Sequence, residues 1–193
     1  MLDMLFSFVM MAEVSKMELE VQKTADSHYV SGAEEVVVTY DVSEWGVVNG
    51  DLEEFREVVR KTLGDVRGWK RAGVRFEEVS SGGQMHLTLT SPEVLGSING
   101  CSSELSCRYG DRVMINDDRW MGSSDTYNAL GIFVDKYRPM VINHEVGHFL
   151  GHYHIDACET SSGKAPIMIT SAAGLLGCSP SIWPLPNELW YSF

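Results

Sequence analysis

The sequence has few basic residues, and this shortage excludes one large class of partner. Lys and Arg number 15 against 27 Asp and Glu, which gives a formal net charge of −12. The negative charge is spread along the chain, and no basic cluster of the kind that binds nucleic-acid phosphates is present. Solubility explains the acidity more simply than a preference for basic substrates does. We therefore expect no nucleic-acid partner.

The sequence also lacks an apolar run long enough to cross a bilayer. The most apolar stretch, residues 1–12 (MLDMLFSFVMMA), is short and carries Asp3. It has neither the basic start nor the small-residue cleavage site of a secretory signal. Two interpretations stay open, a degenerate export segment and a plain amphipathic start, and the polar residues 13–31 are typical of a linker. We predict a poorly structured lead over residues 1–33, one monomeric domain over residues 34–193, and no stable membrane span.

Only four cysteines are present, and none forms the paired CxxC spacing of a zinc knuckle. Sequence proximity favours disulfides between Cys101 and Cys107 and between Cys158 and Cys178. The alternative is four free thiols in a reducing cytosol. The disulfide interpretation predicts an extracytoplasmic location, in which the weak signal for export at the N-terminus would have a role.

Hydrophobic periodicity predicts an α+β domain with a small sheet. A helix is expected over residues 52–64, with Asp51 as its N-cap and Gly64 as its stop. A later helix is expected to open at Tyr137, with Pro139 in its first turn. Surface loops are expected over residues 91–111 and 117–131. Alternating or β-branched segments predict strands at residues 35–42, 74–79, 85–90 and 112–116. His86 falls in the third strand, where packing explains it better than a metal does.

The second half of the chain contains a dense histidine cluster, NHEVGHFLGHYH, at residues 143–154. His144 and His148 are four residues apart, so a helix places them on one face where both can bind one cation. Gly151 can end that helix because glycine tolerates the left-handed conformation. His154 could then return to the metal as the third ligand. His152 would replace it if the helix continued through Gly151, and Asp156 is a weaker substitute.

This residue set predicts a catalytic rather than a structural Zn²⁺ site. Three neutral imidazoles leave one coordination position open for water. Glu145 is then expected to act as the general base toward that water and to return the proton to the departing amine of a peptide bond. A second donor to the developing oxyanion is left open among Tyr127, Tyr137 and Tyr153.

The pattern HEVGHFLGHYH resembles the HExxHxxGxxH signature of the metzincin clan of zinc metallopeptidases. The resemblance rests on His144, Glu145, His148, Gly151 and His154, and residues 165–168 (APIM) resemble the clan's methionine turn. It implies one catalytic zinc ion, Met168 beneath the metal, and a short C-terminal subdomain after the glycine turn. Some members have a tyrosine ligand two residues after the methionine. Thr170 stands there in this chain, so no such ligand is expected.

The resemblance also implies a fold and a way to bind substrate. The fold would be a twisted mixed sheet with a backing helix and an active-site helix. Residues 112–116 would form its edge strand, with Val113, Met114 and Ile115 as candidates to pair with an extended polypeptide substrate. More closely, the APIM turn, Gly177-Cys178 and Trp183-Pro184 resemble a bacterial family of secreted metzincin-like domains without an assigned substrate, over residues 34–186.

The expected function is therefore that of a zinc-dependent endopeptidase acting outside the cytoplasm. Two alternatives keep the metal. One is a zinc-binding module without turnover, although the presence of Glu145 argues against it. The other is a zinc amidase or peptidase that acts on cell-wall peptide.

Overall fold

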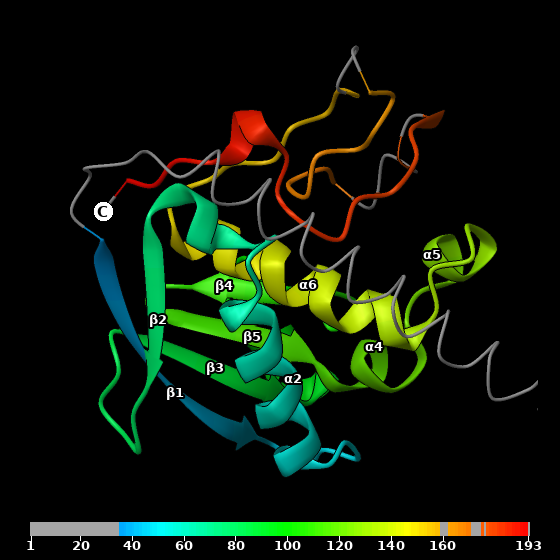
Figure 1. Cartoon of the computed structure of the whole chain (residues 1–193). Helices are drawn as coiled ribbons and strands as arrows, with labels where there is room; N and C mark the ends of the chain where they lie inside the picture. Colours follow the sequence, from blue (N-terminus) through cyan, green and yellow to red (C-terminus); the bar gives the residue numbers. More distant parts are fainter. Residues whose placement is uncertain (1–34, 159–161, 171–174, 176, 193) are drawn as a thin grey trace, which may run out of the picture.

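The fold is an α+β arrangement in which helices cover one face of a five-stranded mixed sheet (Figure 1). The computed structural model describes residues 35–158, 162–170, 175 and 177–192. The lead expected over residues 1–33 lies outside these described residues. None of the helices in the described part of the chain is long and apolar enough to cross a membrane.

The sheet has the strand order β2-β1-β3-β5-β4. Its first four members in that order run parallel, and only β4 is antiparallel to its neighbour β5. Connections between parallel strands need a crossover, and helix α2 provides the one between β1 and β2. The strands are β1 (Val36–Trp45), β2 (Val74–Glu78), β3 (Met85–Thr90), β4 (Cys107–Tyr109) and β5 (Arg112–Asn116).

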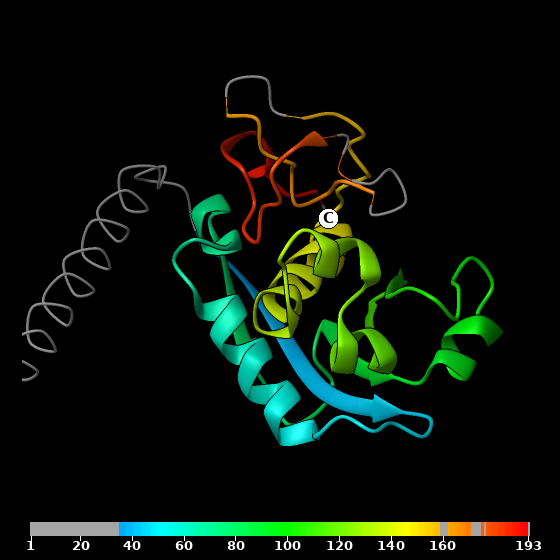
Figure 2. The same cartoon turned by 90° about the vertical axis from the view of Figure 1, so that its right-hand side faces the viewer.

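Two long helices, α2 (Leu52–Gly64) and α6 (Val134–Phe149), lie side by side on the same face of the sheet (Figures 1 and 2). Phe55 and Val59 of α2 and Ile142 and Val146 of α6 are each fully buried in the core between these layers. A short 3-10 helix, η1 (Trp69–Ala72), follows α2, and its Trp69 indole N–H donates to the carbonyl of Asn143 on α6 (3.1 Å). Helix α6 is thus held both by its buried side chains in the core and by the hydrogen bond from Trp69.

Periodicity predicted α2 and the parallel strands well. The helix spans the expected residues, and the Asp51 side chain accepts a hydrogen bond from Glu54 N (2.7 Å), as an N-cap does. Strand β3 has the expected bounds, whereas β1 continues three residues further, to Trp45. His86 is a partly buried strand residue whose Nδ1 lies 2.9 Å from the carboxylate of Asp41.

The two predicted surface loops were wrong in part, because each contains short helices. Residues 91–111 include α3 (Pro92–Ser97) and the strand β4, and residues 117–131 include α4 (Asp117–Gly122) and α5 (Asp125–Ala129). Side chains of Ser91, Asn116 and Ser124 cap the three helices. One or two helical turns are too short to produce a periodic pattern, so only these capping residues could have indicated them.

The start of α6 was also placed too late in the sequence. The helix begins at Val134, where the amides of Lys136 and Tyr137 donate to Phe133 O, and Pro139 lies inside it. Proline at this position removes one helical hydrogen bond. Burial of the apolar residues around it on α6 compensates for the lost bond.

The prediction that residues 112–116 form the edge strand was wrong. Strand β5 lies between β3 and β4, and Val113, Met114 and Ile115 are fully buried there. The chain reverses at Gly110, whose φ of +64° suits glycine, and β4 is the strand at the edge. An extended polypeptide therefore cannot pair with β5. On this side of the sheet, β4 is the strand with which such a polypeptide could pair.

The segment after α6 has little regular structure and covers the C-terminal end of that helix (Figure 1). Two disulfides form, Cys101–Cys107 and Cys158–Cys178, each with Cα atoms 5.8 Å apart, so the pairing expected from sequence proximity is confirmed. Disulfides persist in oxidising compartments, so the two bonds indicate an extracytoplasmic location.

Residues 165–169 of this segment pack directly against α6. Ala165, Ile167, Met168 and Ile169 are all buried, and Met168 lies against Gly147. A Cβ added to Gly147 would lie 2.3 Å from Met168 Sδ and 2.9 Å from Trp69 Cζ2. The close approach of α6 to the methionine thus requires a residue without a side chain.

Replacing Gly147 with alanine is expected to lower the free energy of unfolding by about 1–3 kcal/mol, because the methyl group must displace packed side chains. Gly64→Ala is the matched control: it is also helical, and nothing lies within 4 Å of its added Cβ. That change should be neutral or stabilise by up to ~1 kcal/mol. Thermal or denaturant unfolding measures both, and equal stability of the two variants would contradict the packing described.

Candidate metal centre

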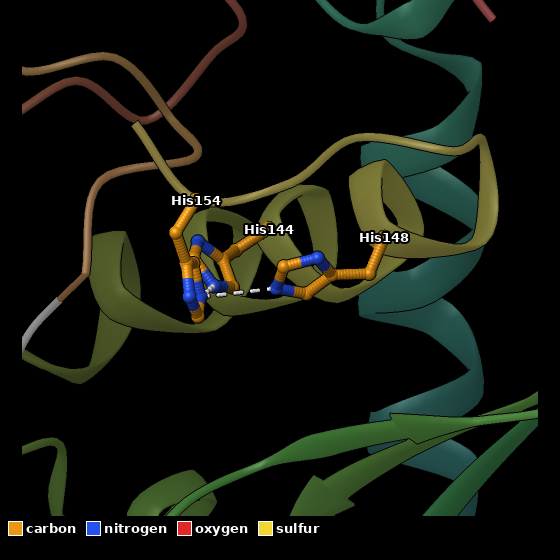
Figure 3. Close-up of side chains that lie close together, drawn as sticks. All are labelled: His144, His148 and His154. Atoms are coloured by element: carbon orange, nitrogen blue, oxygen red, sulfur yellow. Dashed lines mark hydrogen bonds between the residues drawn. The ribbon is translucent and has the colours of Figure 1, made fainter. Parts of the chain in front are cut away.

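Three histidine side chains converge at the C-terminal end of α6 (Figure 3). His154 Nε2 lies 3.1 Å from His148 Nε2 and 3.3 Å from His144 Nε2. All three candidate ligand atoms lie within 4.8 Å of one another. The predicted ligand set is therefore brought together, and it could hold a metal ion.

The turn after α6 is what delivers His154 to the other two histidines. The helix ends at Phe149, and Gly151 adopts φ +102°, a conformation that other residues rarely take. A Cβ there would also lie 2.7 Å from the carbonyl of Ser192. The predicted helix stop at Gly151 is confirmed, and two independent constraints, conformation and space, demand glycine.

Backbone carbonyls orient the two helical histidines. His144 Nδ1 donates to Ile167 O (2.7 Å), and His148 Nδ1 donates to His152 O (2.9 Å). In a neutral ring the proton on Nδ1 leaves a free lone pair on Nε2, which is the atom that faces the cluster. This tautomer is the one that a metal site needs.

The same two imidazoles are also held in their neutral form. Burial, with a contribution from neighbouring His148, lowers the pKa of His144 to about 3. Burial likewise lowers the pKa of His148. At neutral pH the rings of His144 and His148 are therefore uncharged and can bind a cation. Imidazole nitrogens are ligands that zinc prefers.

His152 and Asp156, the alternatives to His154, point elsewhere. The ring of His152 is 3% exposed and lies between Trp69 and Trp190, with centroid distances of 4.9 and 3.8 Å. Its Nε2 donates to Trp190 O (2.9 Å). Asp156 accepts a hydrogen bond from Thr170 Oγ1 (2.5 Å). Their side chains support the turn, and neither belongs to the converging group.

Glu145 lies beside the histidines and is 5% exposed. Burial raises the pKa of its carboxyl to about 8, because an apolar environment penalises the charged form. Its side chain nonetheless lines a surface cavity of about 440 Å³ that also contains the three histidines. A carboxyl group with a pKa near neutrality in a cleft is a candidate acid–base group.

Met168, which the resemblance would place beneath a metal, packs against Gly147 of α6. It is fully buried, and its carbonyl accepts a hydrogen bond from Ile155 N (2.9 Å), next to His154. The residue before it, Ile167, carries the carbonyl that holds His144. The turn over residues 165–168 thus contacts both chain segments that supply histidines.

Sequence reasoning missed Glu188, which organises this turn. The side chain is fully buried and accepts hydrogen bonds from the amides of Ile167 (3.0 Å), Met168 (2.9 Å) and Leu185 (2.8 Å). Pro186–Glu188 forms a single 3-10 turn, η3. A lone glutamate in a Pro-Asn-Glu sequence gives no pattern that distinguishes it from a surface residue, so no sequence signal could have found it.

The cavity extends from the histidines to the edge strand β4. Its remaining lining includes residues 100–102, residues 105–108 and the side chains of Tyr127 and Tyr137. These two rings are buried and meet edge to face at 5.6 Å, and burial raises the pKa of Tyr127 to about 12. Tyr153, the third tyrosine considered, is 86% exposed at the rim.

Fold and site together define an α+β protein with a three-histidine centre that could hold a metal. Residues 11–176 match the family described as "Protein of unknown function (DUF3152)", and because this match covers most of the sequence, the chain belongs to that family. No curated protein matches the chain.

Metal binding should depend on His154 and should not depend on the side chain of His152. His154→Ala is expected to lose stoichiometric zinc. His152→Phe should retain it, because His148 contacts only the main-chain carbonyl of His152 and the phenyl ring can stay between the tryptophans. Metal analysis of the dialysed, folded proteins checks this. Zinc lost only from His152→Phe would contradict the assignment.

Glu188→Gln should weaken zinc binding as well as the fold. The amide NH₂ would face backbone donors, so the turn that holds His144 through Ile167 O would shift. Loss of such an outer partner typically reduces metal affinity about 10–100-fold. Competition with a chromophoric chelator, at a temperature where the variant stays folded, gives the affinity. Glu93→Gln, at an exposed position on α3, is the control. Unchanged affinity in a destabilised variant would limit Glu188 to a structural role.

Proposed function

We propose that this protein is a zinc-dependent endopeptidase that acts outside the cytoplasm. The observation that carries the proposal is the convergence of three imidazole nitrogens beside a buried glutamate in an open cleft. Three protein ligands leave a position for water, which distinguishes catalytic from structural zinc sites. The disulfides support the proposed location.

His144, His148 and His154 would hold the zinc ion through their Nε2 atoms. A bound zinc ion supplies Lewis acidity, which makes water acidic enough to lose a proton near neutral pH and offsets negative charge on a carbonyl oxygen. The carbonyls of Ile167 and His152 keep the His144 and His148 rings in the orientation that this requires.

Glu145 would act as the proton carrier of the reaction. Its carboxylate takes a proton from the attacking water and delivers it to the amine nitrogen of the departing peptide. Burial suits the residue to both steps, because a raised pKa makes the carboxylate a stronger base than an exposed glutamate would be. General acid–base groups of this kind typically contribute about 10²–10⁴-fold in rate.

Membership of the metzincin clan is part of the same proposal. The spacing HExxHxxGxxH, the left-handed Gly151 and the buried Met168 beneath α6 support it. The five-stranded mixed sheet with α2 and α6 packed on one face is compatible with that fold. We further propose that an extended polypeptide binds along β4, because this edge strand lines the cleft.

Glu145→Gln should separate metal binding from turnover. The amide keeps the size of the side chain but cannot take a proton, so cleavage of an unfolded protein such as casein should fall by at least about 10²-fold. Zinc content should persist, because the three imidazoles are untouched. The control is Glu44→Gln, at an exposed position on β1. Activity that survives in Glu145→Gln would reject Glu145 as the base.

The same experiment weighs the two alternatives. A wild-type protein that holds one zinc ion but cleaves neither casein nor a broad peptide library would be a binding module. Release of fragments from cell-wall peptide alone would identify an amidase or peptidase of the cell wall. Both outcomes are read by mass spectrometry of the reaction products.

A further inference from the structure

The edge strand β4 places a cation beside the three histidines. Arg108 lies directly opposite Val113 in the pairing of β4 with β5. Residues opposite one another on paired strands share a face of the sheet, and Val113 belongs to the core on the α6 side. Arg108 therefore projects toward α6, and it lines the cleft.

Arg108 differs from every other arginine in the chain. The guanidinium groups of the other eight each contact a carboxylate, a backbone carbonyl or an aromatic ring within the described residues. For Arg108, the described residues provide no such contact to the guanidinium.

The cleft excludes acidic side chains in general. Of the residues that line it in the described part of the chain, Glu145 alone carries a carboxyl group, and that group is buried. The formal charge of the whole chain is −12, so the cleft is a local exception to an acidic surface. A guanidinium without an internal partner in such a cleft favours an anionic ligand over a cationic one.

We propose that Arg108 determines substrate specificity by binding a carboxylate of the polypeptide that lies along β4, close to the bond that is cut. The inference rests on the proposed peptidase function, and it adds the chemical class of the substrate. Guanidinium groups bind carboxylates through paired N–H donors, which fixes position as well as charge. Arg108 would hold the peptide in register, while Glu145 and the histidines act on the neighbouring peptide bond.

Two sources can supply this carboxylate, an acidic side chain within the polypeptide and the α-carboxylate at its C-terminus. Casein digestion first locates the bonds that are cut. Peptide pairs built on those sites then carry Glu or Gln at one position within three residues of the cut, with both ends blocked. A further peptide has neutral side chains and a free C-terminal carboxylate. Preference for one set over its neutral counterpart identifies the source.

The wild type should prefer the carboxylate peptide about 2–5-fold in kcat/KM, a size typical of a solvent-exposed ion pair. In Arg108→Gln this ratio should fall to about 1, whereas Arg108→Lys should keep part of it because the charge remains. Arg60→Gln, which removes an exposed arginine of α2, should keep the full ratio. Added salt should reduce the preference of the wild type. The proposal is overturned if the wild type shows no preference, or if Arg108→Gln retains it.

Binding measurements keep this inference separate from the peptidase proposal. The zinc-loaded Glu145→Gln protein is titrated with blocked peptide pairs that differ only in Glu or Gln and are chosen independently of any cleavage site. Affinity is followed by fluorescence anisotropy with and without Arg108→Gln. Carboxylate preference that depends on Arg108, in a protein whose wild type cleaves nothing, would reject the peptidase proposal and leave carboxylate recognition standing. Cleavage without a preference for the carboxylate peptide would support the peptidase proposal and reject carboxylate recognition by Arg108.

Discussion

The hydrogen bond from His144 Nδ1 to Ile167 O, 2.7 Å long, is the interaction on which the arrangement of the site depends. It joins helix α6, which packs on the sheet, to the C-terminal segment, whose described residues contain little regular structure. Without it the His144 ring could rotate, and its Nε2 would lose the tautomer that leaves a lone pair free. The C-terminal segment thus orients His144 through the carbonyl of Ile167, and the neighbouring carbonyl of Met168 holds the chain next to His154.

In its described residues the C-terminal segment forms only the turn η3 and one isolated β-bridge, Lys164–Ser179, so other contacts help to hold the Ile167 carbonyl in place. The buried carboxylate of Glu188 accepts the amides of Ile167 and Met168, which would otherwise lack partners in the core. The Cys158–Cys178 disulfide closes a loop around the same turn. Met168 packs against a glycine on α6, where any larger residue would push the turn away. A buried charge, a covalent bond and close packing replace secondary structure here.

The sequence predicted the local features of the fold. It did not predict features that depend on contacts between residues far apart in the sequence. The strand β3, the helix α2 and the stop at Gly151 follow from periodicity and backbone preference within a few residues, and each was predicted. The order of strands was not predicted, because the hairpin that places β4 outside β5 depends on a three-residue strand without a pattern of its own.

Glu188 and Arg108 were missed for a similar reason: what distinguishes them is their surroundings in the folded chain. The helix stop at Gly151 favoured His154 over His152 from the sequence, and the position of the His152 ring between two tryptophans shows that it does not join the cluster.

Burial couples the state of Glu145 to the occupancy of the proposed metal site. With a pKa raised to about 8, the carboxyl is mostly protonated at neutral pH in a protein without metal, and it cannot then act as a base. A cation held by the adjacent histidines would favour the carboxylate, since opposite charges a few ångströms apart stabilise each other strongly in a buried site. The fraction of Glu145 that is deprotonated, and so able to act as a base, would rise when the ion is bound. Among the described residues that line the cleft, no second carboxylate competes with Glu145 for the cation or for the proton, which reinforces this coupling.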